Sequence, residues 1–119
     1  MPKISEKNPL PPCPATPNCI RTSEVYQTGL EMVYEAFIKV FDEESYRWEV
    51  IDLKRIELHA VYRIPVFGFK DDVDVIMEEA DGTTTVFIRS ASRVGAYDLG
   101  VNQRRVKRIL KKAELKIKS

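Results

Sequence analysis

The pair Asp81-Gly82 constrains the fold of this chain more than any other feature of its sequence. Aspartate followed by glycine is a preferred pair for a two-residue β-hairpin loop, because both central positions take a positive φ. With this loop, Asp74 lies opposite Arg89, and the apolar side chains of the two flanking segments also meet one another. A shift by one residue would break every match, so the sequence predicts a hairpin of fixed register.

Apolar periodicity predicts the remaining elements. Leu30, Val33 and Phe37 recur at helical spacing, and the acidic run 42–44 should end this first helix. Thr28, three residues before Glu31, predicts a capping box at its start. Patterns with a period of two predict four strands, near residues 47–52, 56–64, 72–78 and 83–90. A second helix should follow Asp98, which is a good N-cap residue.

This order of elements predicts an α+β fold, a four-stranded antiparallel sheet with two helices packed on one face. Six of the seven prolines lie in residues 1–22, which we expect to form an extended proline-rich arm. Residues 23–119 should then form a single α+β domain. Val61, Ile76 and Phe87 would point away from the helices, and we expect the arm to cover them.

The run from Arg89 to Asn102 joins the last strand to the last helix and is dense in polar side chains. Arginine forks and hydroxyl groups beside a helix N-terminus are typical of an anion-binding pocket. A second interpretation is a polar brace that fixes the strand to the helix, in which Arg93 pairs with a nearby aspartate. The candidate ligand-binding residues are Arg89, Ser90, Ser92, Arg93, Asp98 and Asn102, with Asp71 and Asp72 beside them.

Catalytic chemistry has little support in the sequence. The one histidine, His59, falls on the outward side of a predicted strand, and no Gly-x-Ser-x-Gly, Walker or dinucleotide-binding pattern occurs. We therefore expect a non-enzymatic binding or accessory domain with no catalytic residues, no metal and no cofactor. A purely structural or assembly module is one alternative. A small metal-assisted hydrolase is another, and it would use Asp71, Asp72, Ser90 and Asp98.

Cys13 and Cys19 are the only cysteines of the chain. Two thiols are too few for a tetrahedral metal site, and their spacing is not that of a Cys-x-x-Cys redox pair. In an oxidising compartment they would form a local disulfide, and in a reducing one they would remain thiols. The sequence leaves both states open.

Charge is distributed unevenly along a chain whose net charge is +1. The last helix is crowded with lysine and arginine, and Glu114 is the one acid among residues 99–119. This basic side either meets an anionic partner, or is solvated, or folds back on the more acidic body. The partners that fit are a small anion, an anionic lipid headgroup or an acidic protein. The helix lacks aromatic residues for stacking, which argues against specific nucleic-acid binding.

The composition, 44% hydrophobic and 31% charged, is typical of a soluble globular domain. The sequence has no apolar stretch of membrane-spanning length, and residues 1–7 lack the apolar centre of a secretory signal. As it stands, the chain is predicted to be cytoplasmic. If its natural N-terminus is longer, we expect an exported or membrane-associated protein.

Three motifs in order resemble a known family. They are CPATPNC at residues 13–19, FKDDV at residues 69–73 and RSASRVGAYDLGVN at residues 89–102. Together they resemble the domain of unknown function 1499 family, over about residues 13–110. The resemblance implies no particular activity. It does imply that export or membrane attachment is common among relatives.

Overall fold

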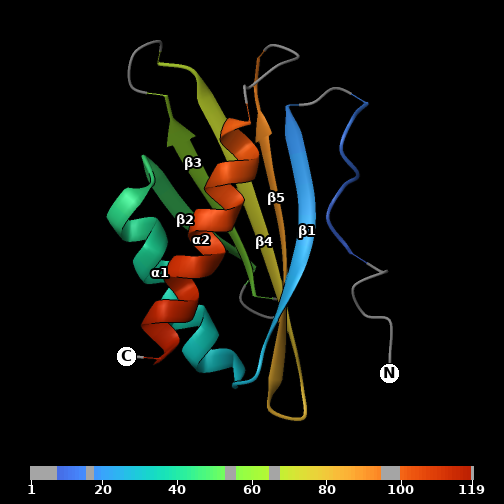
Figure 1. Ribbon diagram of the computed structural model, residues 1–119, viewed down its shortest axis with the longest axis vertical. Coiled ribbons are helices and arrows are strands. Elements are labelled where there is room, and N and C mark those ends of the chain that lie inside the picture. Colours follow the sequence, from blue (N-terminus) through green and yellow to red (C-terminus); the bar gives the residue numbers. More distant parts are fainter. Residues whose placement is uncertain (1–7, 16–17, 53–55, 65–67, 95–99, 119) are drawn as a thin grey trace.

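The computed structural model describes residues 8–15, 18–52, 56–64, 68–94 and 100–118, which form one sheet with two helices on one face (Figure 1). We call the face that the helices cover the inner face and the opposite one the outer face. The α+β class with two helices is confirmed, but the sheet of the described residues has five strands rather than four. The elements are β1 (Cys19–Tyr26), α1 (Leu30–Glu44), β2 (Arg47–Asp52), β3 (Glu57–Arg63), β4 (Lys70–Ala80), β5 (Thr83–Ser92) and α2 (Val101–Lys118).

The strands are all antiparallel and lie in the order β1-β5-β4-β3-β2. The strand that the sequence analysis missed is β1, an edge strand that pairs with β5 from Cys19 opposite Ala91 to Tyr26 opposite Thr84. Both of its faces are partly exposed, so its sequence lacks a clear apolar alternation. The predicted boundary at residue 22 therefore falls inside a strand.

The β4–β5 hairpin has the register that the sequence predicts. Asp74 lies opposite Arg89, and Ala80 lies opposite Thr83 across the two-residue loop. Asp81 and Gly82 have φ values of 53° and 76°, as a type I′ turn requires. This hairpin places the polar run that begins at Arg89 next to the acidic start of β4.

The helix α1 presents its predicted apolar stripe to the inner face, where Val33 and Phe37 are fully buried. The predicted capping box is wrong, because Gly29 is the N-cap and its helix has no side-chain cap. Instead, the carboxylate of Glu79 on β4 accepts a hydrogen bond of 3.2 Å from the backbone amide of Leu30. A negative charge at this position compensates the positive end of the helix dipole.

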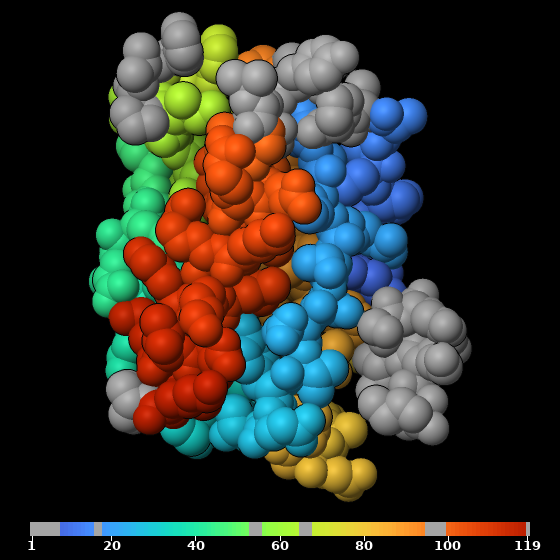
Figure 2. Space-filling model, viewed as in Figure 1, coloured from blue at the N-terminus to red at the C-terminus, as the bar shows by residue number. Residues whose placement is uncertain are grey.

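The basic helix α2 crosses the inner face between α1 and β1 (Figure 2). Part of its basic side folds back on the acidic end of α1, where Arg108 lies 3.0 Å and Lys112 3.5 Å from Glu44. Lys116 lies 2.7 Å from Glu43. Acids at the end of α1 are unfavourable for their own helix dipole, and these cations offset that cost. No helix of the described residues is long and apolar enough to cross a membrane.

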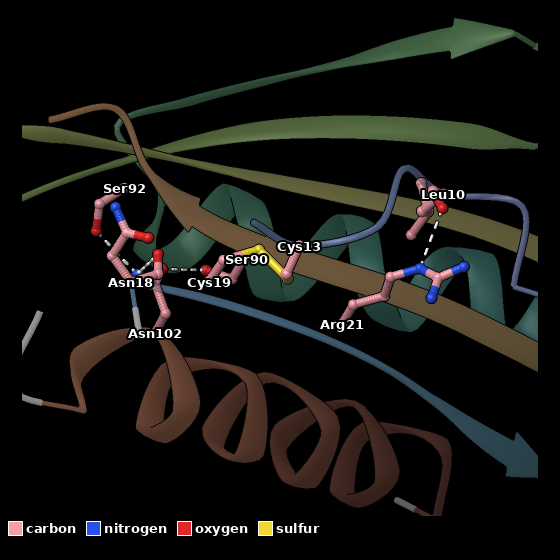
Figure 3. The surroundings of a disulfide bond; sticks show 8 residues. All are labelled: Leu10, Cys13, Asn18, Cys19, Arg21, Ser90, Ser92 and Asn102. Carbon is pink, nitrogen blue, oxygen red and sulfur yellow. Dashed lines mark hydrogen bonds between the residues drawn. A yellow bond between two sulfur atoms is a disulfide. The ribbon is translucent and has the colours of Figure 1, made fainter. Parts of the chain in front are cut away.

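The described part of the N-terminal arm before β1, residues 8–15, runs back beside β1 and is fixed to the outer face (Figure 1). Leu10 is buried in a small cluster with Ile76 and Phe87, so the arm covers two of the three predicted outward apolar residues. The third, Val61, is buried but is not part of this cluster. The guanidinium of Arg21 on β1 donates to the carbonyl of Leu10 at 3.1 Å (Figure 3). It also donates to the carbonyl of Asn8 at 2.7 Å.

The arm is also attached covalently, by a disulfide between Cys13 and Cys19 (Figure 3). Their Cα atoms are 5.7 Å apart. Of the two states that the sequence left open, the structure therefore has the oxidised one. The bond fixes the arm to the first residue of β1.

Candidate functional site

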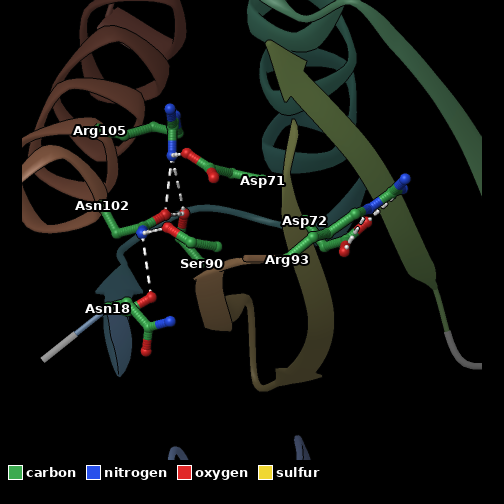
Figure 4. A network of polar contacts seen from close by, with 8 residues as sticks. Asn18, Asp71, Asp72, Ser90, Arg93, Asn102 and Arg105 are labelled. Atoms are coloured by element: carbon green, nitrogen blue, oxygen red, sulfur yellow. Dashed lines mark hydrogen bonds and ion pairs between the residues drawn. The ribbon is translucent and has the colours of Figure 1, made fainter. Parts of the chain in front are cut away.

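The predicted corner is divided between the two faces of the sheet. Adjacent residues of a strand point to opposite faces, so the carboxylates of Asp71 and Asp72 are separated by the sheet (Figure 4). Asp98 lies outside the described residues. Of the other predicted residues, Asp71, Ser90, Ser92 and Asn102 lie on the inner side, and Asp72, Arg89 and Arg93 lie on the outer side.

The inner half contains a residue that the sequence analysis placed wrongly. All lysines and arginines of the last helix were predicted to lie on its basic side, yet the side chain of Arg105 is 6% exposed and its Nη1 lies 2.8 Å from Oδ2 of the fully buried Asp71. Its guanidinium also stacks over the ring of Tyr62, 4.8 Å from the ring centre. The burial of Arg105 could have been predicted from its position in the sequence, three residues after Asn102 and next to Val106. Both of these residues lie on the buried side of α2.

Asn102 is the centre of the inner network (Figure 4). Its Oδ1 accepts hydrogen bonds from the hydroxyl of Ser90 and from Arg105 Nη1, at 2.7 Å for the latter. Its Nδ2 donates to Ser92 Oγ at 2.9 Å and to the carbonyl of Asn18 at 3.1 Å. One amide thus joins the start of α2 to β5 and to the residue before β1, which is the geometry of a brace.

The contact between Asp71 and Arg105 is an ion pair rather than an aligned hydrogen bond. Among the described residues, neither oxygen of Asp71 accepts a hydrogen bond, and Arg105 Nε also has no acceptor. A buried carboxylate in this condition is stabilised mainly by the attraction of its one cationic partner.

The outer half is a chain of four charged or titratable groups. Nε and Nη2 of Arg93 each donate to one oxygen of Asp72, both at 2.9 Å. His59 lies between two acids, with Nε2 3.2 Å from Asp72 Oδ1 and Nδ1 2.7 Å from Asp74 Oδ1. The hydrogen bonds of Arg93 lower the pKa of Asp72, and the hydrogen bond with Asp74 raises the pKa of His59. His59 thus belongs to this half of the corner, although its sequence position gave no sign of a role.

Arg89 occupies the same face one rung further along the sheet. It lies opposite Asp74 on β4 and opposite Arg21 on β1. Asp74 pairs with His59 instead, and within the described part of the chain Arg89 Nε is buried with no hydrogen-bond acceptor. Its positive charge still helps to lower the pKa of Asp72. In the same part of the chain, no group of three or more His, Cys, Asp or Glu side chains is arranged to hold a metal ion.

A family model matches residues 9–112, from the arm through the first two thirds of α2. Its description is "Protein of unknown function (DUF1499)". The chain belongs to this family. The match covers both halves of the corner, so the inner network and the outer chain of charges lie in the segment that this DUF1499 domain shares with the family model. No curated protein matches the chain.

Solved structures similar to this DUF1499 domain include two with low sequence identity. One is a crystal structure of TTHA0849 from Thermus thermophilus, with a TM-score of 0.42 and 12% identity, covering 83% of this chain and 96% of that one. The other is a crystal structure of Ara h 8.0201, with a TM-score of 0.47 and 15% identity at the same coverages, 83% and 96%.

Proposed function

We propose that this DUF1499 domain is a non-enzymatic binding domain that takes an anionic group at Arg93 on its outer face. The observation that carries this proposal is the orientation of an exposed guanidinium, whose side chain is 41% exposed. A guanidinium has five N–H donors, and Asp72 accepts from Nε and from one N–H of Nη2. The outer fork of Nη1 and Nη2 is therefore held in place with donors left for a ligand.

The inner half supports this function indirectly. Asp71, Ser90, Ser92 and Asn102 are engaged with protein groups, and together with Arg105 they hold β4 and β5 against α2. This favours the brace interpretation for that half of the corner. It also weakens the hydrolase alternative, because Asp71 and Asp72, two of the three carboxylates that it would use, lie on opposite faces of the sheet.

The charges around Arg93 are compatible with a bound anion. Asp72 offsets the charge of Arg93, and His59 and Arg89 lie close enough to Asp72 to lower its pKa as well. His59 is charged over a wider pH range than an isolated histidine, because Asp74 raises its pKa. Arg93, Arg89 and protonated His59 thus balance the acids Asp72, Asp74 and Glu49, so the neighbouring acids do not leave a net negative charge that would repel an anion at Arg93.

The test is a thermal-shift titration of the full chain with sulfate, phosphate and a dicarboxylate. A ligand that binds the native state raises the melting temperature, and we expect at least one of these anions to do so. Arg93→Gln should lose this response. The matched control is Lys107→Gln, which removes one positive charge from an exposed position on α2 and should keep it. An equal response in Arg93→Gln and in the control would refute the proposal.

A further inference from the structure

We infer that the anion is a phosphate group and that Arg63, Lys70 and Tyr46 complete its site beside Arg93. This inference rests on the proposed function and extends it to residues outside the two halves of the corner; of the three, only Lys70 lies in a sequence motif, FKDDV. The group of Tyr46, Arg63 and Lys70 is called the cation–tyrosine cluster below.

The first support is the alignment of three cationic residues on three adjacent strands. Arg63, the last residue of β3, lies opposite Lys70, the first residue of β4. The backbone amide of Arg93 donates to the carbonyl of Lys70 at 3.1 Å, which extends the pairing of β4 and β5 by one residue. Neighbouring strands are about 4.8 Å apart, so the three residues follow one another across the end of the sheet.

The second support is an aromatic ring that both Arg63 and Lys70 contact. Arg63 Cζ lies 5.0 Å and Lys70 Nζ 5.3 Å from the centre of the Tyr46 ring, distances at which a cation is attracted to an aromatic face. Tyr46 directly precedes β2 and is 51% exposed. The ring thus keeps both cations at one accessible place instead of leaving them to move independently in solvent.

The third support is the lack of acidic partners. Within the described part of the chain, neither Arg63 nor Lys70 forms an ion pair with a carboxylate, whereas Arg108 and Lys112 on α2 share Glu44. Two positive charges held beside one ring repel each other, and an anion between them would relieve that repulsion. Asp72, which lies two residues after Lys70 on β4, already pairs with Arg93.

The number of cations favours phosphate over a carboxylate. The two oxygens of a carboxylate are satisfied by the fork of a single guanidinium. A phosphate monoester has three terminal oxygens and a charge approaching −2 near neutral pH, so it can contact Arg63, Lys70 and Arg93 together. The ligand chemistry that this end of the sheet fits is therefore a phosphate group with free oxygens.

The same chemistry has two sources, a soluble phosphate ester and a lipid headgroup. Phe69 and Val94 flank Lys70 and Arg93 in the sequence, and they are 49% and 53% exposed. Apolar side chains beside cations would add contacts with a lipid surface that free phosphate cannot make. The experiment therefore needs one arm for each source.

The first arm is a titration of the full chain with inorganic phosphate, followed by NMR at the Tyr46 ring and by calorimetry. We expect Arg63→Gln/Lys70→Gln to weaken binding by about tenfold or more, because charge-assisted hydrogen bonds are lost. The matched control, Lys107→Gln/Lys111→Gln, removes the same charge from exposed positions of α2 and should bind like the wild type. Tyr46→Leu keeps both charges and should weaken binding by a smaller factor, because the cations lose their common support.

The outcomes separate this inference from the proposed function. If Arg63→Gln/Lys70→Gln binds phosphate as tightly as the control while Arg93→Gln does not, the cation–tyrosine cluster is not part of the site, and the proposed function stands. If the wild type responds to none of the anions in either experiment, both are refuted.

The second arm uses phosphatidylcholine vesicles with and without phosphatidic acid. A lipid source predicts sedimentation with the phosphatidic acid vesicles that falls in Phe69→Ser/Val94→Ser, while inorganic phosphate still binds that variant. A soluble source predicts no sedimentation of the wild type. Each result supports the phosphate site only if Arg63→Gln/Lys70→Gln abolishes the corresponding binding, and retained binding in that variant overturns it.

Discussion

Asp71 and Arg105 form an ion pair that is closed off between the sheet and α2, with 2.8 Å between Oδ2 and Nη1. Neither oxygen of Asp71 accepts a hydrogen bond from a described residue. The pair thus connects β4 to α2 by charge attraction in a place that solvent does not reach. A buried ion pair of this kind contributes little net stability to the fold. The loss of one partner is costly, however, because the other charge then stays buried without compensation.

The first prediction concerns this pair. Arg105→Met should lower the free energy of unfolding by about 3–5 kcal/mol, because the carboxylate of Asp71 stays buried without its cation. Urea denaturation at neutral pH would measure the loss. The double variant Asp71→Leu/Arg105→Met removes both charges and should be more stable than the single variant. A double variant at or below the stability of the single one would show that the pair acts through packing and not through charge.

The second prediction concerns pH. The hydrogen bond with Asp74 raises the pKa of His59 above its usual value of 6.5. The stability contributed by protonated His59 is therefore fully present below pH 6.5 and is lost as the pH rises through the higher pKa of the folded state. The wild type should lose more stability than His59→Gln as the pH rises above 6.5. Parallel loss in both proteins, measured by urea denaturation across this range, would contradict the assignment.

The third prediction concerns the arm. Leu10 is buried with Ile76 and Phe87 on the outer face, so Leu10→Ala should lower the free energy of unfolding by about 2 kcal/mol, the low end for buried leucines. Ile51→Ala is the control, because this side chain is exposed and its truncation should have little effect. Equal melting temperatures for Leu10→Ala and wild type would mean that the arm does not protect this face.

The fourth prediction concerns the disulfide. The bond closes a short loop, with a sequence separation of 6, so Cys13→Ser/Cys19→Ser should lower the free energy of unfolding by about 2 kcal/mol. A reducing agent should destabilise the wild type by a similar amount and leave the double variant unchanged. Destabilisation of the double variant by the reductant would point to an effect unrelated to this bond.

The parts of the fold that follow from the sequence are those with local causes. The turn Asp81-Gly82 and the pairs that flank it set the β4–β5 register within a few residues, and the stripe of α1 repeats within one helix. The edge strand β1 follows from no such pattern, because its partner β5 lies near the other end of the chain, with Cys19 opposite Ala91. The contact between Glu79 and the start of α1 also joins residues that are distant in sequence.

The candidate site was predicted as a set of residues but not as a geometry. The motifs placed the polar side chains at the right end of the sheet. The sequence analysis began the third predicted strand at Asp72, whereas β4 begins at Lys70. Asp71 was therefore not recognised as a strand residue whose side chain lies on the face opposite to Asp72. The burial of Arg105 was not predicted, because the residue was classified by its charge and not by its position on the helix. The cation–tyrosine cluster joins β3, β4 and the residue before β2, and no sequence spacing indicates that contact.

The position of β1 beside β5 also sets an order for folding during synthesis. The strands β2 to β5 each lie next to their neighbour in the chain, so they can pair as they leave the ribosome. The first strand to be made must wait until Ser92, the end of its partner, has emerged. Until then the local Cys13–Cys19 loop can constrain this segment covalently. The pairing of β1 with β5 is therefore a late event, because it needs the chain as far as Ser92.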